Sequence, residues 1–127
     1  MRITALVLQM VIRLLAVVQV VVGLLFWSGN AFSYIPVHML LGILLVLCLW
    51  IVAILAWRAG APLGMVGAAV VWGLLTVWLG LTQAELLPGD LHWLIRVLHL
   101  LVGIGAVGLA EALGVRVKRR VLSPAAA

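Results

Sequence analysis

Residues 91–115, LHWLIRVLHLLVGIGAVGLAEALGV, form an apolar stretch that is long enough to cross a membrane and that carries ionisable side chains near its start. Within it, His92, Arg96, His99 and Gly103 are separated by four, three and four positions. This spacing follows the helical repeat and places all of them on one helical face. Because ionisable groups are unfavourable in lipid, we expect this face to line the interior of a helix bundle and to mark a site.

The composition of the whole chain indicates an integral membrane protein. Of its 127 residues, 68% are hydrophobic and 9% are charged, which is far from the range of soluble domains. A chain of this length has room for about four spans. We therefore expect one all-α bundle, in which any chemistry takes place among the helices. Cys48 is the single cysteine, which excludes an intramolecular disulfide.

Interruptions of the apolar pattern predict four membrane spans and a short tail. The spans are expected at residues 3–27, 36–57, 63–84 and 91–115, so the bundle covers residues 1–115 and a basic tail covers residues 116–127. The first span is too long, and too often interrupted by polar residues, for a signal peptide. Short connections predict an up-down-up-down bundle in which the second and fourth helices are parallel and lie on a diagonal.

The distribution of Lys and Arg predicts the orientation in the membrane. Basic residues occur at the amino end, in the second connection and in the tail, whereas the first and third connections have none. The positive-inside rule then predicts cytoplasmic termini in a plasma or inner membrane. The net charge of +5 is suited to anionic lipid, and no basic soluble domain is present that would bind nucleic acid.

His38 in the second span is the natural counterpart of His99. Both histidines lie in the outer part of helices that start on the outer face, so their imidazoles are expected at one level. Two imidazoles on diagonal helices suit the axial positions of a haem iron held in the bundle core. A buried, hydrogen-bonded role explains either histidine alone equally well, and it is the pairing at matched depth that favours His38 and His99 as metal ligands.

Glycines accompany both histidines. Gly42 and Gly103 each follow a histidine by four residues, and a glycine there leaves space for a macrocycle. Gly23 and Gly80, near the outer ends of the first and third spans, are expected at the same level. Glycine also serves ordinary helix packing, so this pattern is weak when taken alone.

Other ionisable residues fit supporting roles. Arg96, one turn outward from His99, is placed either to bind a haem propionate or to extend toward lipid headgroups. His92 lies at the water boundary, where a solvated interfacial histidine is the ordinary interpretation and a proton-linked, metal or redox-partner role is the alternative. Arg13 and Glu111 are expected to form an ion pair between the first and fourth helices. No arrangement typical of a catalytic site is present.

The chain resembles the four-helix half of the haem A synthase family over roughly residues 9–111. The features that carry the resemblance are the run from Gln19 to Gly23, the sequence Pro36-Val37-His38 and the position of His99. The resemblance implies axial histidines near the outer ends of the second and fourth helices. The substrate-processing half of that family has a glutamate before its second-helix histidine and an arginine after it, where this chain has Ile35 and Met39. The resemblance is therefore to the half that retains haem b.

These observations predict a small membrane b-type cytochrome with one bis-histidine haem b. We expect an electron-transfer protein rather than a self-contained enzyme, with a quinone or a redox protein on the outer face as partner, and a place as a subunit of a respiratory membrane complex. Two alternatives stay open. One is a haem-handling protein of the haem A synthase type, and the other is a cofactor-free structural subunit.

Overall fold

The structure is a computed structural model that describes the backbone of residues 2–122 and the side chains of residues 3–119. Its elements are α1 (Arg2–Trp27), the 3-10 turn η1 (Phe32–Tyr34), α2 (Ile35–Arg58), α3 (Leu63–Thr82) and α4 (His92–Leu122). Each α-helix is long and apolar enough to cross a membrane. The predicted all-α bundle is confirmed, and the chain is a multi-pass membrane protein.

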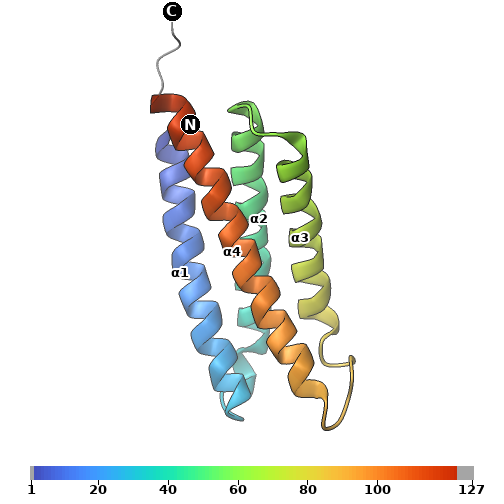
Figure 1. Cartoon of the computed structure of the whole chain (residues 1–127). Helices are drawn as coiled ribbons and strands as arrows, with labels where there is room; N and C mark the ends of the chain where they lie inside the picture. Colours follow the sequence, from blue (N-terminus) through green and yellow to red (C-terminus); the bar gives the residue numbers. More distant parts are fainter. Residues whose placement is uncertain (1, 123–127) are drawn as a thin grey trace, which may run out of the picture.

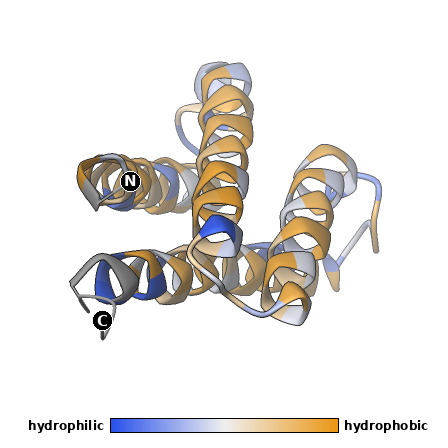
Figure 2. Ribbon diagram, turned by 90° about the horizontal axis from the view of Figure 1, so that it is seen from above, coloured by the Kyte–Doolittle hydropathy of each residue, from blue (hydrophilic) through white to orange (hydrophobic). Residues whose placement is uncertain are grey.

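Consecutive helices alternate in direction, which gives the expected up-down-up-down topology (Figure 1). The end of the bundle where α1 begins and α4 finishes is called the terminal end below. The opposite end, where α2 and α4 begin, is called the histidine end. α2 and α4 therefore run in the same direction. They pack against each other as well as against both outer helices, and α1 and α3 flank this central pair (Figure 2).

Glycine determines where two of the helices stop. Gly29 after α1 and Gly60 after α2 have φ of 80° and 84°, a left-handed conformation that suits glycine. In each case the next amide donates to a carbonyl five residues earlier, Asn30 to Leu25 and Ala61 to Ala56. These bonds form Schellman motifs, which satisfy the last helical carbonyls and turn the chain sharply.

The last two helices differ slightly from the predicted spans. α3 ends at Thr82, before the predicted limit at residue 84, because the chain turns there toward the connection that precedes α4. α4 does not stop at Val115 but continues through Leu122, so residues 116–122 of the predicted tail are helical. Lys and Arg are good helix formers, and they are favourable in the last turns of a helix. Residues 123–127 lie outside the described residues.

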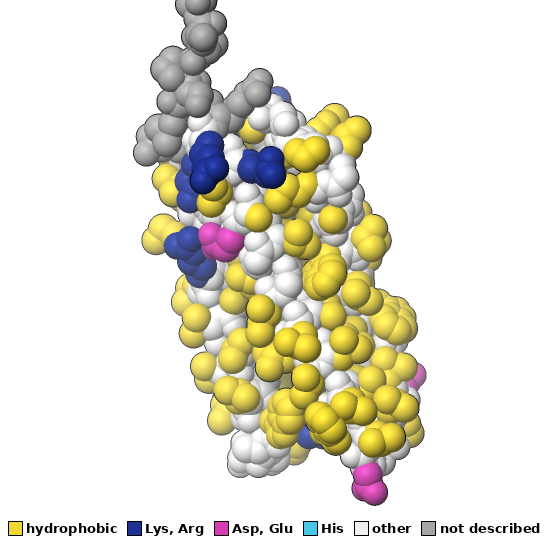
Figure 3. All heavy atoms as spheres, in the orientation of Figure 1, with side chains coloured by type: hydrophobic (Ala, Val, Ile, Leu, Met, Phe, Trp, Pro, Cys, Tyr) yellow, Lys and Arg dark blue, Asp and Glu magenta, His cyan; other side chains and the backbone are white. Residues whose placement is uncertain are grey.

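Close packing is concentrated toward the terminal end. The largest buried cluster there is rich in alanine, including Ala53, Ala56, Ala106 and Ala110. Small residues let helices approach closely, which matters in lipid because apolar side chains gain little by leaving it. Outside this core the bundle presents an apolar surface, and basic side chains gather at the terminal end (Figure 3).

The ion pair predicted between α1 and α4 is confirmed. Arg13 Nε and Nη2 contact the two carboxylate oxygens of Glu111 at 2.7 and 2.8 Å. Gln9, which is 2% exposed, donates its side-chain amide to the same carboxylate at 2.8 Å. Glu111 is thereby held by a cation and an amide at once, and α1 is joined to α4 by polar contacts that extend from the buried Gln9 to the exposed Arg13 on the bundle surface.

Candidate functional site

His38 and His99 face each other across the central helix pair. His38 is the fourth residue of α2 and His99 is the eighth residue of α4, so both lie near the histidine end. Their ring centroids are 6.3 Å apart and their planes are inclined by 53°. The structure therefore brings together the two histidines that the sequence analysis paired.

The separation of the two rings suits an axial ligand pair. An Fe–N bond of about 2 Å and a distance of about 1 Å from ring nitrogen to ring centre, counted on both sides, put two axial imidazole centres about 6 Å apart. The observed separation of 6.3 Å agrees with this value. Among the described residues, no group of three or more His, Cys, Asp or Glu side chains is placed to hold a metal ion. A porphyrin supplies four equatorial nitrogens itself, so it needs only the two histidines.

The hydrogen bonding of the pair is incomplete. Nδ1 of His38 and Nδ1 of His99 are both buried, and neither has a hydrogen-bond partner within the described part of the chain. Buried polar atoms are nearly always satisfied in native structures. Neither Nδ1 atom is therefore held by a hydrogen bond to another described residue, as it would be in a histidine that is hydrogen-bonded within the core.

Gly23 and Gly80 lie beside the two rings, at the level predicted for them. A Cβ atom built on Gly23 would be 3.8 Å from His38 Cε1, and one on Gly80 would be 3.4 Å from His99 Cε1. Each hairpin of the bundle thus sets a glycine of its first helix against the histidine of its second helix. The absence of a side chain leaves the edge of each imidazole uncovered on this side.

Gly42 and Gly103 differ from each other. A Cβ on Gly103 would meet nothing within 4 Å, which agrees with the open space expected one turn below His99. A Cβ on Gly42 would be 2.8 Å from Gln19 Nε2. The space beside Gly42 is therefore taken by the Gln19 amide, because that amide reaches across α2 to donate to the His38 carbonyl at 3.0 Å.

Two residues of α1 contact His38 without having been predicted to do so. Gln19 donates to the backbone carbonyl of His38, and its own Oε1 is buried with no hydrogen-bond partner among the described residues. The ring of Phe26 meets the His38 ring edge to face, with centroids 5.3 Å apart. Gln19 was noticeable in the sequence as a polar residue four positions before Gly23. The position of Phe26 depends on the rotation of α1, for which the sequence carries no signal.

Packing is sparse around the pair. No hydrophobic residue of α1 beyond Leu15 is fully buried, and none of α2 is before Leu45. At this end a small cluster of Leu79, Ile95 and Val102 forms the only other buried hydrophobic group in the described residues. The histidine end therefore lacks the dense core of the terminal end, and a planar group between His38 and His99 would supply the contacts that are missing there.

The remaining residues of the predicted stripe on α4 lie farther out. His92 Nδ1 is 3.1 Å from the Leu86 carbonyl, so this histidine fastens the start of α4 to the preceding connection. Arg96 is exposed, and no ion pair is formed by its side chain within the described residues. His92 is therefore separate from the histidine pair. Arg96 lies three residues before His99 on α4, and its guanidinium forms no ion pair within the described residues.

Comparisons with protein-family models, curated proteins and solved structures found no match to this chain.

Proposed function

We propose that this protein is a small membrane b-type cytochrome that holds one haem b between His38 of α2 and His99 of α4. The observation that carries the proposal is the 6.3 Å separation of the two ring centroids on helices that run in the same direction. The unpartnered imidazole nitrogens and the loose packing near the pair support it. The resemblance to the haem b-retaining half of haem A synthases points the same way.

The protein's own residues would supply the axial ligands and the space. Haem iron supplies one-electron oxidation and reduction when it is bound. Two histidine ligands leave no open iron position, so this donor set favours electron transfer over oxygen chemistry. Gly23 and Gly80 keep large side chains away from the rings, and Gln19 fixes the backbone of His38. Arg96 adds a positive charge at the outer margin of the site.

The position of the site defines the partners to be expected. His38 lies within about one turn of the start of α2, so a haem there would have an edge close to the membrane surface at the histidine end. With both termini in the cytoplasm of a cell bounded by a plasma or inner membrane, this is the outer surface. A quinone or a redox protein at that surface, within a respiratory membrane complex, would exchange electrons with the haem.

A reduced-minus-oxidised visible spectrum of the purified full-length protein tests the proposal. We expect the absorption bands of a low-spin haem b, with one haem for each chain. A protein that shows no such bands after expression with ample haem, and takes up no haem on reconstitution, would contradict the proposal and favour a cofactor-free structural subunit. A second, exchangeable porphyrin in each chain would instead favour a haem-handling protein.

A further inference from the structure

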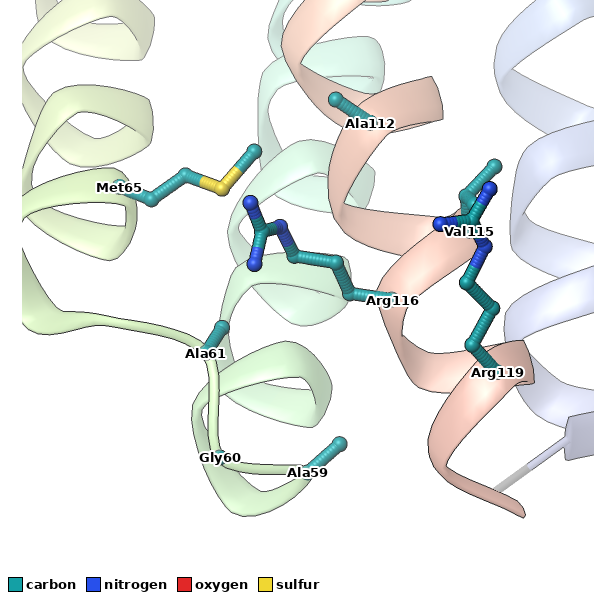
Figure 4. Close-up of a pocket in the computed structure, with 8 residues that line it drawn as sticks. All are labelled: Ala59, Gly60, Ala61, Met65, Ala112, Val115, Arg116 and Arg119. Carbon is teal, nitrogen blue, oxygen red and sulfur yellow. The ribbon is translucent and has the colours of Figure 1, made fainter. Parts of the chain in front are cut away.

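A separate hollow lies at the terminal end of the bundle. It has a volume of about 660 Å³ and opens between the turn that joins α2 to α3 and the last turns of α4. Gly60 and Ala61 of the turn, Met65 of α3, and Ala112, Arg116 and Arg119 of α4 contribute to its lining. In Figure 4 the Arg116 side chain extends from α4 across the hollow toward Met65, whereas the Arg119 side chain runs along α4.

The lining of this hollow is cationic. Both arginines are exposed, and within the side chains that the structure describes neither forms an ion pair. The lining includes no acidic residue. Glu111, the carboxylate on the same helix, is already bound by Arg13 and Gln9. Two guanidinium groups at the edge of an apolar bundle therefore lack a counter-charge among the described side chains, and a phosphate group would supply one through paired N–H donors.

A second, apolar hollow continues along the same two helices. It has a volume of about 300 Å³ and is lined by Ala68 and Trp72 of α3 and by Gly105 and Leu109 of α4. Trp72 donates its indole N–H to the Val102 carbonyl at 2.8 Å, which fixes the indole as a wall of this hollow.

The two hollows share one face of each helix. On α4 the lining residues Gly105, Leu109, Ala112 and Arg116 follow one another at spacings of four, three and four, and on α3 Met65, Ala68 and Trp72 follow at three and four. Residues at these spacings lie on one side of a helix. The α3–α4 groove thus has a cationic mouth at the membrane surface and an apolar floor that runs inward.

We propose that the α3–α4 groove binds one anionic glycerophospholipid, with its phosphate at Arg116 and Arg119 and an acyl chain along Ala68 and Leu109. Charge complementarity selects an anionic ligand, and the apolar lining of the second hollow selects one that carries an acyl chain, because a free phosphate ion would contact only the cationic part. Basic pockets between membrane helices are known to hold anionic lipid headgroups. This site is independent of the histidine pair, which lies at the other end of the bundle.

Native mass spectrometry of the detergent-solubilised full-length protein tests the proposal. Titration with dioleoyl phosphatidylglycerol should give one tightly retained lipid, and dioleoyl phosphatidylcholine should be retained more weakly. The double variant Arg116→Gln/Arg119→Gln should weaken phosphatidylglycerol binding by roughly thirtyfold, since each basic residue near a lipid surface contributes about 1 kcal/mol and about 1.4 kcal/mol corresponds to a tenfold change in affinity. Arg58→Gln is the matched control, because Arg58 lies at the same end of the bundle outside the groove. It should leave the affinity unchanged.

Two further measurements separate a lipid site from a simple anion site. Ala68→Leu fills the apolar part of the groove at an exposed position and keeps every charge, so it should weaken retention of phosphatidylglycerol. Inorganic phosphate at millimolar concentration should compete poorly. The proposal would be overturned if the wild type retained the two lipids equally, or if the double variant and Arg58→Gln lost affinity equally. It would also be overturned if Ala68→Leu had no effect or if phosphate competed efficiently.

Discussion

Nδ1 of His38 and Nδ1 of His99 are buried, and neither has a hydrogen-bond partner among the described residues. A buried polar atom without a partner is unfavourable in a protein interior. The haem proposed above would bind one nitrogen of each ring through its iron, and the 6.3 Å separation of the ring centroids suits that arrangement. At the residue scale, the neighbours of His38 and His99 therefore become the informative positions to change.

Arg96→Leu is expected to weaken haem retention by roughly fivefold, the effect of losing one charge-assisted contact at an exposed position. The midpoint potential should also fall, because the oxidised iron carries one more positive charge and is destabilised more by a nearby guanidinium. Redox titration and haem occupancy measure the two effects. Arg96→Lys should restore the potential but only part of the retention, since lysine lacks the fork of donors. Unchanged values in Arg96→Leu would mean that the side chain only reaches toward headgroups.

Gly80→Leu is expected to lower haem occupancy by roughly fivefold, because the added side chain would occupy space beside the His99 ring that the haem needs. The first added atom would already be 3.4 Å from His99 Cε1. Gly67→Leu on the same helix is the control, since a Cβ there would meet nothing within 4 Å. Haem content per chain after identical purification gives the comparison. Equal haem content in both variants would show that Gly80 serves only helix packing.

At the scale of elements, polar groups connect helices that are otherwise held by small apolar residues. Gln9 and Arg13 of α1 both bind Glu111 of α4, and Gln19 of α1 binds the backbone of α2. Hydrogen bonds between membrane helices have few alternative partners in lipid, so they help to fix how each helix is rotated. The rotation of α1 is thus fixed by the contacts of Gln9 and Arg13 with α4 and by the contact of Gln19 with α2.

Arg13→Leu is expected to lower the thermal unfolding temperature, because it leaves the Glu111 carboxylate without its cation on a membrane-spanning helix. The double variant Arg13→Leu/Glu111→Leu should be more stable than Arg13→Leu alone, since it removes the uncompensated charge as well. Thermal unfolding in detergent micelles, with the single and double variants compared side by side, measures this coupling. Additive effects of the two substitutions would argue that the ion pair contributes nothing.

The elements could largely be predicted from the sequence, because hydropathy and turn residues determine where a membrane helix begins and ends. The limit at Val115 was wrong as a helix end, since basic residues were assigned to a tail although they continue α4 through Leu122. The juxtaposition of His38 and His99 could be predicted, because both lie at a similar depth in helices that run in the same direction. The contacts of Phe26, and of Gln19 beside Gly42, could not, because they depend on the rotation of α1.

The two ends of the molecule differ in packing and in charge. Dense packing and basic side chains lie toward the terminal end, whereas the loosely packed histidine end contains the candidate redox site. A site that holds a planar group needs room between helices, and a bundle with such an opening needs a well-packed region elsewhere to keep its helices together. The orientation of the two ends across the membrane then decides which compartment the site serves.

Single cysteines in a Cys48→Ala background test that orientation. Asn30→Cys in the first connection should react with a membrane-impermeant thiol reagent from the outer side, and Pro62→Cys, between α2 and α3, should react only from the cytoplasmic side. Both positions are exposed, so accessibility depends on the side of the membrane alone. Labelling of intact and opened cells makes the comparison, and the reverse pattern would move the histidine site to the cytoplasmic surface.

The most direct test of haem ligation by His38 and His99 is the low-temperature electron paramagnetic resonance spectrum of the oxidised protein and its three histidine variants. The wild type and His92→Ala should give the low-spin signal of a bis-imidazole haem, because His92 contacts only the Leu86 carbonyl and not the pair. His38→Ala and His99→Ala should each lose that signal and become high-spin or haem-free. A low-spin bis-imidazole signal that persists in either His38→Ala or His99→Ala would contradict the proposal that both histidines bind the haem iron.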